Sequence, residues 1–455
     1  MSTFKYSDMQ LQEIERLSDA YRFFLNKGKT ERECVAEAIR LAEGVGYRPL
    51  EYRRPVNAGD RVYLTRMGKT IALFHIGEES LENGINVLGA HIDSPRLDGK
   101  QLPLYEAGGF AYLDLHYYGW IKKYQWVTIP LAIHGVVILK DGSIVPVVIG
   151  EEKNDPIFCV TDLLPHFASE QLALPASKVI DGEAIDLLLG TTPEDGAQDD
   201  SVQKHMAHLL KEKYGFSESD FLSAELEVVP AGEAREAGLD KSMIFAYGQD
   251  DRSCAFASLS AFLQQDTPKR TSCCILVDKE EIGSFGATGA QSFFFRDAVA
   301  DVLAAAGFDS EWSLRRCLHN SVMLSSDVAA AFDPLYSSVF EKRTSAFLGR
   351  GVNFNKYTGS NGKEGTNDAS PEFIAQLRRI MDESNVHYQL TEFSKVDIGL
   401  GGTIASMFAH NGLQVIDCGV PVLSMHSPGE LIGKTDLYEA WKCYGAFLRC
   451  AQAIR

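Results

Sequence analysis

Short apolar runs and amphipathic stretches alternate along much of the chain, so the pattern predicts strands and helices in turn. Two amphipathic helices open the chain, because Ser7 and Thr30 each begin a capping-box pattern. An early strand is predicted at 86–91. In the second half, strands are predicted at 243–247, 272–278, 322–326, 388–391 and 414–418, and helices at 253–263, 371–383, 404–410 and 437–449. This alternation predicts an α/β fold with a mostly parallel sheet flanked by helices.

One long segment interrupts the alternation. Between about 102 and 229 the chain is rich in aromatic and β-branched residues, as in 110–118, 126–139 and 143–149, and a single helix is predicted at 201–214. Such stretches are typical of strands. We therefore expect a β-rich domain, residues 101–234, inserted into a discontinuous main domain of residues 1–100 and 235–455.

Length, charge and cysteine usage narrow the class of protein. At 455 residues the chain is too long for one ordinary core. Its formal charge of −18 argues against a nucleic-acid partner, which needs a basic face. No apolar run is long enough to cross a membrane, and the polar N-terminus does not resemble a signal peptide. Nine cysteines without short paired spacings indicate reduced thiols, so we expect a cytoplasmic protein.

The most informative chemistry is the pair Glu280-Glu281, which directly follows the apolar run at 273–277. Two adjacent carboxylates at the rim of a buried strand repel each other unless a cation or a proton lies between them. In a hydrolase with two metal ions, one Glu can bind metal while its neighbour activates the bridging water. The alternative is a solvated acidic turn.

Other His and Asp residues follow the ends of other predicted strands, where ligands gather in α/β sheets. Five of them form the predicted metal-ligand set: His91, Asp250, Glu281, Asp327 and His426. Two imidazoles and three carboxylates suit zinc, with cobalt or manganese as substitutes. Asp250 is expected to bridge the two ions, and Asp93 to accept from the His91 ring. Glu280 is then left as the general base.

Each of these residues has a purely structural alternative. A single His at a strand end is commonly just a hydrogen-bonded polar residue. Asp250 and Asp327 could each cap a following helix. The motif Gln249-Asp250-Asp251 also has an earlier copy, Gln198-Asp199-Asp200, which follows a turn-rich loop. We predict that this earlier copy caps the helix at 201–214.

Six motifs, in this order, resemble the aspartyl aminopeptidase / vacuolar aminopeptidase I family of zinc exopeptidases. They are Gly89-Ala90-His91-Ile92-Asp93-Ser94-Pro95-Arg96, Gln249-Asp250-Asp251-Arg252, Asp278-Lys279-Glu280-Glu281-Ile282-Gly283, Ser325-Ser326-Asp327, Gly401-Gly402-Thr403-Ile404 and Met425-His426-Ser427-Pro428. The resemblance runs nearly end to end. It implies two zinc ions per subunit on the ligands named above, and removal of one N-terminal amino acid at a time from peptides.

The resemblance also implies an assembly. Members of the family form tetrahedral dodecamers built from dimers, with the active sites facing an internal chamber. Residues 101–234 would be the dimerisation domain, and residues 1–100 with 235–455 the catalytic metallopeptidase domain. In the family, a histidine of the inserted domain stabilises the tetrahedral intermediate in a neighbouring subunit, and His166 matches it in position. The alternative for His166 is a surface histidine.

Two departures from the eukaryotic aspartyl enzymes bear on substrate choice. Val328-Ala329-Ala330-Ala331 stands where those enzymes carry histidines, and Asp250 is followed by Asp251-Arg252 instead of Asn and an apolar residue. Selection of an N-terminal Asp or Glu needs a cation near the first side chain. Lys356 is the candidate by family position, and its alternative is a solvated Lys in a Gly-rich loop.

Two other functions remain open. One is a different dizinc amide hydrolase on the same sheet, such as a carboxypeptidase or a small-molecule deacylase. A carboxypeptidase needs a cation for the free carboxylate, whereas an aminopeptidase needs acidic groups for the free α-amine, so spare carboxylates favour the aminopeptidase. The other is an inactive assembly scaffold, which would have lost a ligand or the base. All five ligands and Glu280 are present.

Overall fold

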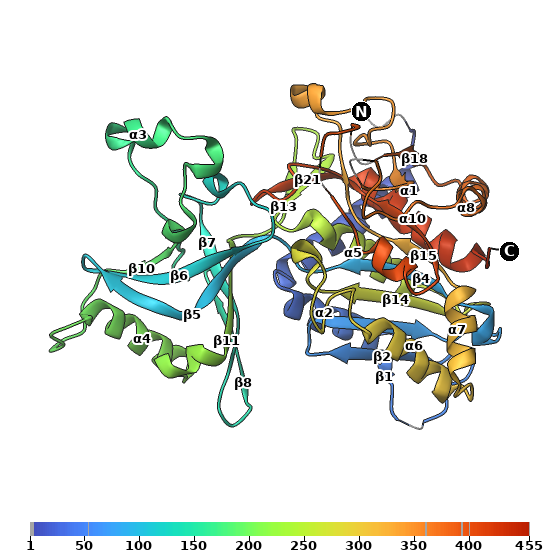
Figure 1. The fold of residues 1–455 in the computed structure, drawn as a ribbon, viewed down its shortest axis with the longest axis horizontal. Coiled ribbons are helices and arrows are strands. Elements are labelled where there is room, and N and C mark those ends of the chain that lie inside the picture. The colour runs from blue at the N-terminus through green and yellow to red at the C-terminus, as the bar shows by residue number, and fades with distance from the viewer. Residues whose placement is uncertain (1–3, 53, 360–361, 393–394, 400, 455) are drawn as a thin grey trace. The chain divides into compact units, whose positions relative to one another are not determined.

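The computed structural model describes residues 4–52, 54–359, 362–392, 395–399 and 401–454 (Figure 1). The chain forms two compact units. The larger comprises Met1–Asp93, Ala234–Met425 and Glu430–Arg455, and the smaller comprises Ser94–Glu233 and His426–Gly429. The larger unit is thus discontinuous, and the chain enters the smaller unit after Asp93, where the sequence predicted a boundary at 100.

A nine-stranded sheet forms the centre of the larger unit. Its four central strands, β14, β4, β15 and β19, run parallel, whereas β3 and β17 are antiparallel to their central neighbours. In spatial order the strands are β1 (Arg48–Pro49), β2 (Arg61–Arg66), β3 (Thr70–His75), β14 (Ser272–Val277), β4 (Asn86–His91), β15 (Val322–Ser325), β19 (Gln414–Gly419), β17 (Val352–Asn355) and β18 (Tyr388–Thr391). The α/β prediction is confirmed.

Helices cover both faces of this sheet. In β4, Leu88 and Ala90 belong to one apolar cluster and Val87 to the other, as the alternation of side chains in a strand requires. The first cluster includes residues of α1 (Asp8–Lys27), α2 (Glu31–Glu43), α5 (Gln249–Leu263), α8 (Pro371–Glu383) and α10 (Lys434–Cys450), and the second includes α6 (Phe294–Ala305), α7 (Glu311–His319) and α9 (Ala405–Ala409). The predicted capping boxes at Ser7 and Thr30 are both formed.

A second, five-stranded sheet in the larger unit corrects one expectation. The strand predicted at 243–247 is β13, and it pairs antiparallel with β12 and β21 instead of joining the central sheet. An apolar run identifies a strand but does not specify its partners. The sheet comprises β12 (Arg235–Ala237), β13 (Met243–Ala246), β21 (Glu430–Gly433), β20 (Pro421–Leu423) and β16 (Ala329–Ala330).

The smaller unit is built on a seven-stranded antiparallel sheet. Its strands in spatial order are β8 (Ile144–Ile149), β7 (Leu131–Ile138), β11 (Ala224–Pro230), β5 (Arg96–Ala107), β6 (Phe110–Tyr118), β10 (Leu187–Gly190) and β9 (Cys159–Val160). The helices are α3 (Ser169–Leu172) and α4 (Ser201–Tyr214). The predicted β-rich segment and its helix at 201–214 are present, whereas the short helix α3 was not predicted.

The cap of α4 differs from the prediction. Asp200 occupies the N-cap position, but its side chain makes no capping hydrogen bond. The carboxylate of Glu106 instead accepts hydrogen bonds from the backbone N–H groups of Val202 (2.8 Å) and Gln203 (3.2 Å). A side chain almost a hundred positions away in the sequence therefore does the capping, which a local motif could not reveal.

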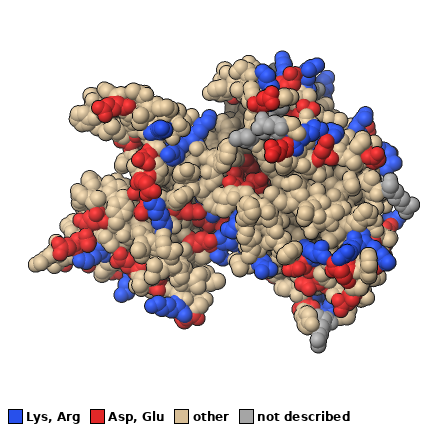
Figure 2. Space-filling view, viewed as in Figure 1, with Lys and Arg blue, Asp and Glu red and all other residues tan. Residues whose placement is uncertain are grey.

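Short 3₁₀ turns join several of these elements. They are η1 (Leu81–Asn83), η2 (Lys123–Gln125), η3 (Pro165–Phe167), η4 (Ala176–Lys178), η5 (Gly182–Ala184), η6 (Glu218–Ser223), η7 (Glu280–Ile282) and η8 (Pro334–Val339). On the face shown in Figure 2, basic side chains occur in small groups beside acidic ones. Among the helices of the described residues, none combines the length and apolar character that crossing a membrane requires.

Candidate metal centre

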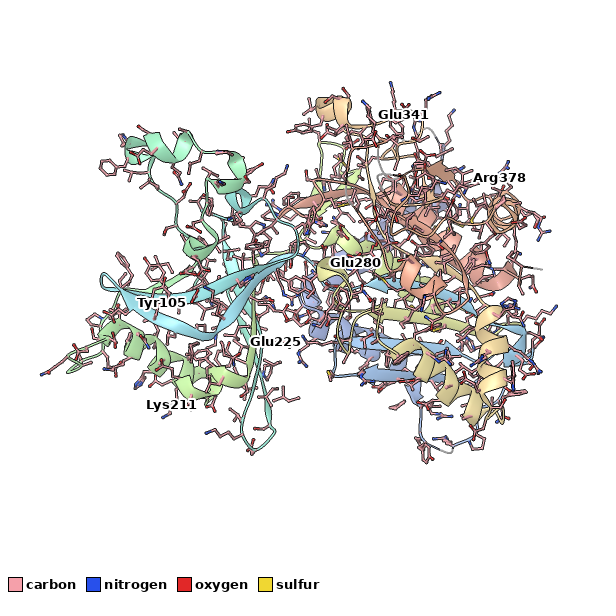
Figure 3. The ribbon with its side chains drawn as sticks, in the orientation of Figure 1. Tyr105, Lys211, Glu225, Glu280, Glu341 and Arg378 are labelled. Carbon is pink, nitrogen blue, oxygen red and sulfur yellow. The ribbon has the colours of Figure 1, made fainter. Side chains whose placement is uncertain are left out.

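The turn after β14 presents the two adjacent glutamates. It is the 3₁₀ turn η7, and residues in the left-handed conformation flank it, Lys279 (φ 70°) and Gly283 (φ 94°). Glu281 is buried, and Glu280, labelled in Figure 3, is partly exposed. The carboxylate of Asp93 accepts hydrogen bonds from the backbone N–H groups of Glu280 (3.1 Å) and Glu281 (3.2 Å). Asp93 therefore fixes the turn that carries both glutamates.

His91 is the last residue of β4 and is buried. Its Nδ1 lies 3.0 Å from the backbone oxygen of Asp93 and 3.3 Å from Oδ1 of the same residue. Its Nε2 lies 3.1 Å from Oδ1 of Asp250 and 4.0 Å from Oε2 of Glu280. With Asp93 beside Nδ1, the other ring nitrogen faces the carboxylates, as a metal ligand with an orienting partner does.

Asp250 and Asp327 meet at His91. One ligand atom from each of the three residues lies within 4.8 Å of the others, and all three residues are buried. A carboxylate oxygen of Asp250 also lies within 4.8 Å of one from Glu281. Three carboxylates and an imidazole thus gather in one small buried volume, which is a donor set that suits zinc.

The backbone at Asp250 and Asp327 does not place either residue at a helix cap. The N-cap position of α5 is Gly248, and the backbone at Asp250 is not helical (φ −82°, ψ 107°). No helix begins at Asp327, because the strand β16 starts two residues later, at Ala329. Capping therefore does not account for the presence of Asp327 here.

Burial and mutual repulsion disturb the protonation of this cluster. Burial raises the pKa of Asp327 well above its ordinary value, and the charges of Asp251, Glu280 and Asp250 raise it further. Burial acts to lower the pKa of His91, but hydrogen bonds with Asp250 and Asp93 and the charge of Glu280 outweigh it and raise that pKa. The cluster thus attracts positive charge, whether as protons or as metal ions.

A glycine allows the central sheet to approach Asp327. Gly419 ends β19, and a Cβ atom built there would lie 1.8 Å from the backbone oxygen of Asp327 and 3.0 Å from Sγ of Cys254. No side chain fits in that space. This residue helps to place the ligand, although no sequence pattern pointed to it.

Two further acidic residues were not among the predicted site residues. Asp251 is fully buried next to Asp250, and burial raises its pKa well above the ordinary value. Glu430 is buried at the start of β21 and accepts a hydrogen bond from the backbone N–H of Asp250 (3.3 Å). Asp251 belongs to a motif that the sequence analysis singled out, whereas only the fold reveals Glu430.

The three other predicted residues are Lys356, His166 and His426. Lys356 follows β17, and its ammonium pairs with the carboxylate of Asp368. His166 is exposed in η3 of the smaller unit. His426 belongs to the segment His426–Gly429, which groups with the smaller unit, and its Nδ1 lies 2.9 Å from the backbone oxygen of Trp120. Their roles in substrate or metal binding stay predictions.

Known proteins match this chain over nearly its whole length. The family model described as aminopeptidase I zinc metalloprotease (M18) matches residues 24–448. A probable M18 family aminopeptidase 1 of Clostridium acetobutylicum is 55% identical over 449 residues, covering 98% of this chain and 97% of that protein. The crystal structure of an M18 family aminopeptidase from Thermotoga maritima has a TM-score of 0.94 at 43% identity, covering 97% of each chain.

A more distant likeness concerns the fold alone. The structure of the mApe1 dodecamer of S. cerevisiae has a TM-score of 0.78 at 20% identity, covering 96% of this chain and 97% of that one. The family model and the Clostridium relative extend over both structural units. The chain therefore belongs to the aminopeptidase I zinc metalloprotease (M18) family and is a zinc-dependent hydrolase of peptides.

Proposed function

We propose that the protein removes the N-terminal amino acid from peptides with two zinc ions per subunit. The observation that carries this proposal is the convergence of His91, Asp250 and Asp327 within 4.8 Å, beside Glu280. These three residues would hold one ion, and Asp250, Glu281 and His426 would hold the other, so that Asp250 is shared. Cobalt or manganese would be substitutes.

Glu280 is the proposed general base. When bound, zinc lowers the pKa of a water molecule and polarises the scissile carbonyl. The Glu280 carboxylate is more exposed than that of Glu281, and its Oε2 lies 4.0 Å from Nε2 of His91, next to the ligands. It would accept the proton of the attacking water and then deliver it to the leaving amine. Asp93 holds this residue through the backbone N–H.

The cations near the motifs favour an aminopeptidase over a carboxypeptidase. Arg252 is buried and donates to the backbone oxygens of Lys29 (2.7 Å) and Ile92 (3.4 Å). Lys279 lies 3.2 Å from Asp278, and Lys356 pairs with Asp368. Since these three cations are already engaged, they are poorly placed to hold a free substrate carboxylate. The acidic cluster suits a free α-amine instead.

We further propose that the chain assembles as a homo-oligomer, a tetrahedral dodecamer built from dimers, through the β-rich insertion. The distant S. cerevisiae relative is described as a dodecamer. In the smaller unit, apolar side chains on either side of His166 are exposed, a composition that favours burial against another subunit. They are Leu163, Leu164, Phe167, Leu172 and Leu174. Light scattering on purified protein measures this assembly directly.

The nine free cysteines support a cytoplasmic location. In this proposal the enzyme acts on cytoplasmic peptides. Lys356 is the proposed contact for an acidic side chain at the first substrate position. Lys356 already pairs with Asp368, which also pairs with Lys363 (2.9 Å), so contact with an acidic substrate would require the Lys356–Asp368 pair to open.

The decisive experiment is a panel of aminoacyl p-nitroanilides and short peptides, assayed with zinc, cobalt or manganese. We expect metal-dependent release of N-terminal residues. Glu280→Gln should retain metal and assembly but lose about 10²–10⁴-fold in turnover, the range expected for loss of a general base. Glu311→Gln, on exposed α7, is the matched control and should behave like the parent. Retained activity in Glu280→Gln would refute the mechanism.

The roles of His166 and Lys356 need separate tests. His166→Ala should lower kcat more than it changes KM, because an oxyanion contact acts in the transition state. Mixing this variant with Glu280→Gln subunits should restore some activity if His166 acts on a neighbouring subunit. Lys356→Met should reduce the cleavage of Asp and Glu substrates selectively. Equal loss on Leu substrates would rule out that contact.

A further inference from the structure

A buried arginine lies at the start of α5, two residues after Asp250, the proposed bridging ligand. Arg252 is only 1% exposed and is among the largest fully buried side chains of the residues that the structure describes. Removing a guanidinium from water costs free energy unless its N–H groups donate to acceptors inside the protein. The partners of Arg252 therefore indicate what this residue does.

The guanidinium joins two segments that are far apart in the sequence. Its Nη2 donates to the backbone oxygen of Lys29 (2.7 Å), in the turn between α1 and α2, and its Nε donates to that of Ile92 (3.4 Å). The group also lies 5.0 Å from the ring centroid of Tyr247, a distance at which a cation is attracted to an aromatic face. Together these contacts hold the guanidinium in one orientation.

Ile92 stands between His91, a proposed ligand, and Asp93, which orients the ligand ring. Its backbone N–H donates to the oxygen of Val277 at the end of β14 (2.9 Å), and its backbone oxygen accepts from Arg252. The peptide group before Ile92 is therefore held by the sheet, and the peptide group after it by the arginine. Because Asp93 contacts both the His91 ring and the glutamate turn, rotation of that second peptide group would disturb both.

The same arginine is tied to Asp250 through the backbone. The N–H of Arg252 donates to the oxygen of Gly248 (3.3 Å), so Asp250 lies within one hydrogen-bonded turn. Oδ1 of Asp250 lies 3.1 Å from Nε2 of His91, which is 159 positions away in the sequence. Arg252 thus connects the segment that carries Asp250 with the segment that carries His91.

We propose that Arg252 is a positioning residue of the metal centre. By holding the carbonyl of Ile92, it keeps His91 and Asp93 in the place relative to Asp250 that a shared ion requires. Lysine cannot replace it, because one ammonium nitrogen cannot reproduce the fixed fork of donors that serves two separate carbonyls. The inference rests on the proposed function, since it assumes that these ligands bind metal.

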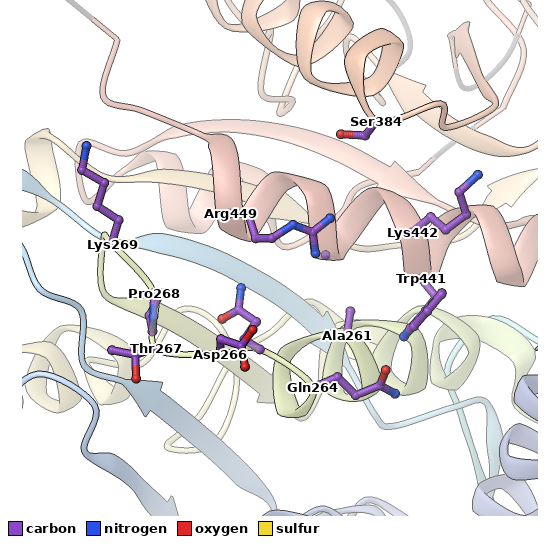
Figure 4. Close-up of a pocket in the computed structure, with 12 residues that line it drawn as sticks. Ala261, Gln264, Asp266, Thr267, Pro268, Lys269, Ser384, Trp441, Lys442 and Arg449 are labelled. Atoms are coloured by element: carbon purple, nitrogen blue, oxygen red, sulfur yellow. The ribbon is translucent and has the colours of Figure 1, made fainter.

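A second buried arginine offers a matched control. Arg270 is 4% exposed, and its guanidinium donates to the backbone oxygens of Asn83 (2.7 Å) and Asn320 (3.0 Å). Its Nε donates to the side chain of the first residue of β4 (3.1 Å), whereas His91 is the last residue of that strand. Figure 4 shows the loop 266–269, which precedes Arg270 and borders a cavity of about 460 Å³ at the end of α5. Arg270 therefore bonds backbone oxygens as Arg252 does, but away from the ligands.

The test compares Arg252→Met, Arg252→Lys and Arg270→Met in the full chain loaded with cobalt, whose visible absorption depends on the geometry of its ligands. We expect both Arg252 variants to shift the cobalt bands. Both should also bind zinc about 10–100-fold more weakly, the range typical when the support of a metal ligand is removed. Arg270→Met should lose thermal stability in chelator, yet it should keep the cobalt bands and the zinc affinity of the parent.

Unchanged cobalt bands and unchanged zinc affinity in Arg252→Met would overturn the proposal. An equal change in Arg270→Met would also overturn it, because the effect would then be one of general destabilisation. If Arg252→Met does not fold, Arg252→Lys decides, since it keeps a positive charge on a side chain of similar length. Absence of cobalt bands in the parent would refute the proposed ligand set and this inference with it, whereas normal bands in the parent and in both Arg252 variants would refute the inference alone.

Discussion

Asp93 places its Oδ1 3.3 Å from Nδ1 of His91. The same carboxylate accepts hydrogen bonds from the backbone N–H groups of Glu280 and Glu281. The parallel register of β4 and β14, which sets His91 opposite Val277, makes both contacts possible. One side chain thus orients an imidazole ligand and the turn that carries the proposed base.

Asp93→Asn should therefore weaken zinc binding. An amide can accept through one oxygen only, so at least one backbone N–H of the turn loses its partner, and the His91 ring loses a negatively charged neighbour. Removal of a hydrogen-bonding partner of a metal ligand typically lowers metal affinity about 10–100-fold. Competition with a chelator measures the change. Asp297→Asn, exposed on α6, is the control, and an unchanged affinity in Asp93→Asn would contradict the positioning role.

Gly419→Ala tests the close approach of β19 to Asp327. The added methyl group cannot fit, because its carbon would lie 1.8 Å from the backbone oxygen of Asp327. We expect a loss of about 1–3 kcal/mol in stability, the usual cost of overpacking, together with weaker zinc binding. Gly182→Ala is the matched control, since its nearest neighbour atom would be 3.6 Å away. Thermal unfolding with and without zinc gives both quantities, and wild-type values for both would refute the steric argument.

Strands with continuous apolar runs could be predicted closely from the sequence. The strand expected at 86–91 is β4, because its apolar run is buried on both faces and polar residues, Asn86 and His91, stand at its two ends. The predicted strand that became β13 is also present, but in the smaller sheet. Local pattern specifies strand formation, whereas pairing depends on contacts between distant segments, which a single sequence does not display.

In the candidate site, too, some features follow from local sequence pattern and others depend on contacts between distant segments. The rule that ligands follow strand ends selected His91, Asp327 and Asp250, and their ligand atoms lie within 4.8 Å of one another, although Asp250 follows a strand of the other sheet. The hydrogen bonds from Asp93 to the glutamate turn depend on the register of β4 and β14. The space at Gly419 depends on the path of β19. Neither can be inferred from spacing along the chain.

The raised pKa of Asp436 predicts that the stability of the protein depends on pH. This residue is buried on α10 and accepts from the backbone N–H groups of Gly349 (2.7 Å) and Gly351 (2.8 Å), and burial raises its pKa to about 7. Since the unfolded carboxyl titrates near 3.9, the folded state binds the extra proton between about pH 4 and 7. The contribution of this carboxyl to stability is therefore greatest at low pH and falls as pH rises through that window.

Comparison with Asp436→Asn isolates this effect, because the amide does not titrate. The Tm of the parent minus that of the variant should decrease as pH rises from 5 to 8. Loss of the hydrogen bonds in the variant adds a constant to this difference and does not change its trend. Differential scanning fluorimetry in chelator measures it. Asp297→Asn should show a constant difference. A difference that grows with pH would mean that the pKa of Asp436 is lowered in the folded state.

Zinc binding should release protons. In the metal-free protein the pKa of His91 is raised by its acidic neighbours against the effect of burial, and burial raises the pKa of Asp327. Zinc binds the neutral imidazole and the ionised carboxylate, so any protons on these groups must leave. The number released should be above zero at pH 6.5 and should decline as pH rises, while the apparent zinc affinity increases.

Calorimetric titration of zinc in two buffers with different heats of protonation counts these protons. Asp327→Asn should release fewer of them, because its side chain carries no titratable proton. His410→Gln, which replaces an exposed histidine after α9, should release as many as the parent. A binding heat that is the same in both buffers would mean that His91 and Asp327 are already deprotonated, and the electrostatic account of the cluster would be wrong. Loss of the buffer dependence in Asp327→Asn alone would assign the proton to that carboxyl.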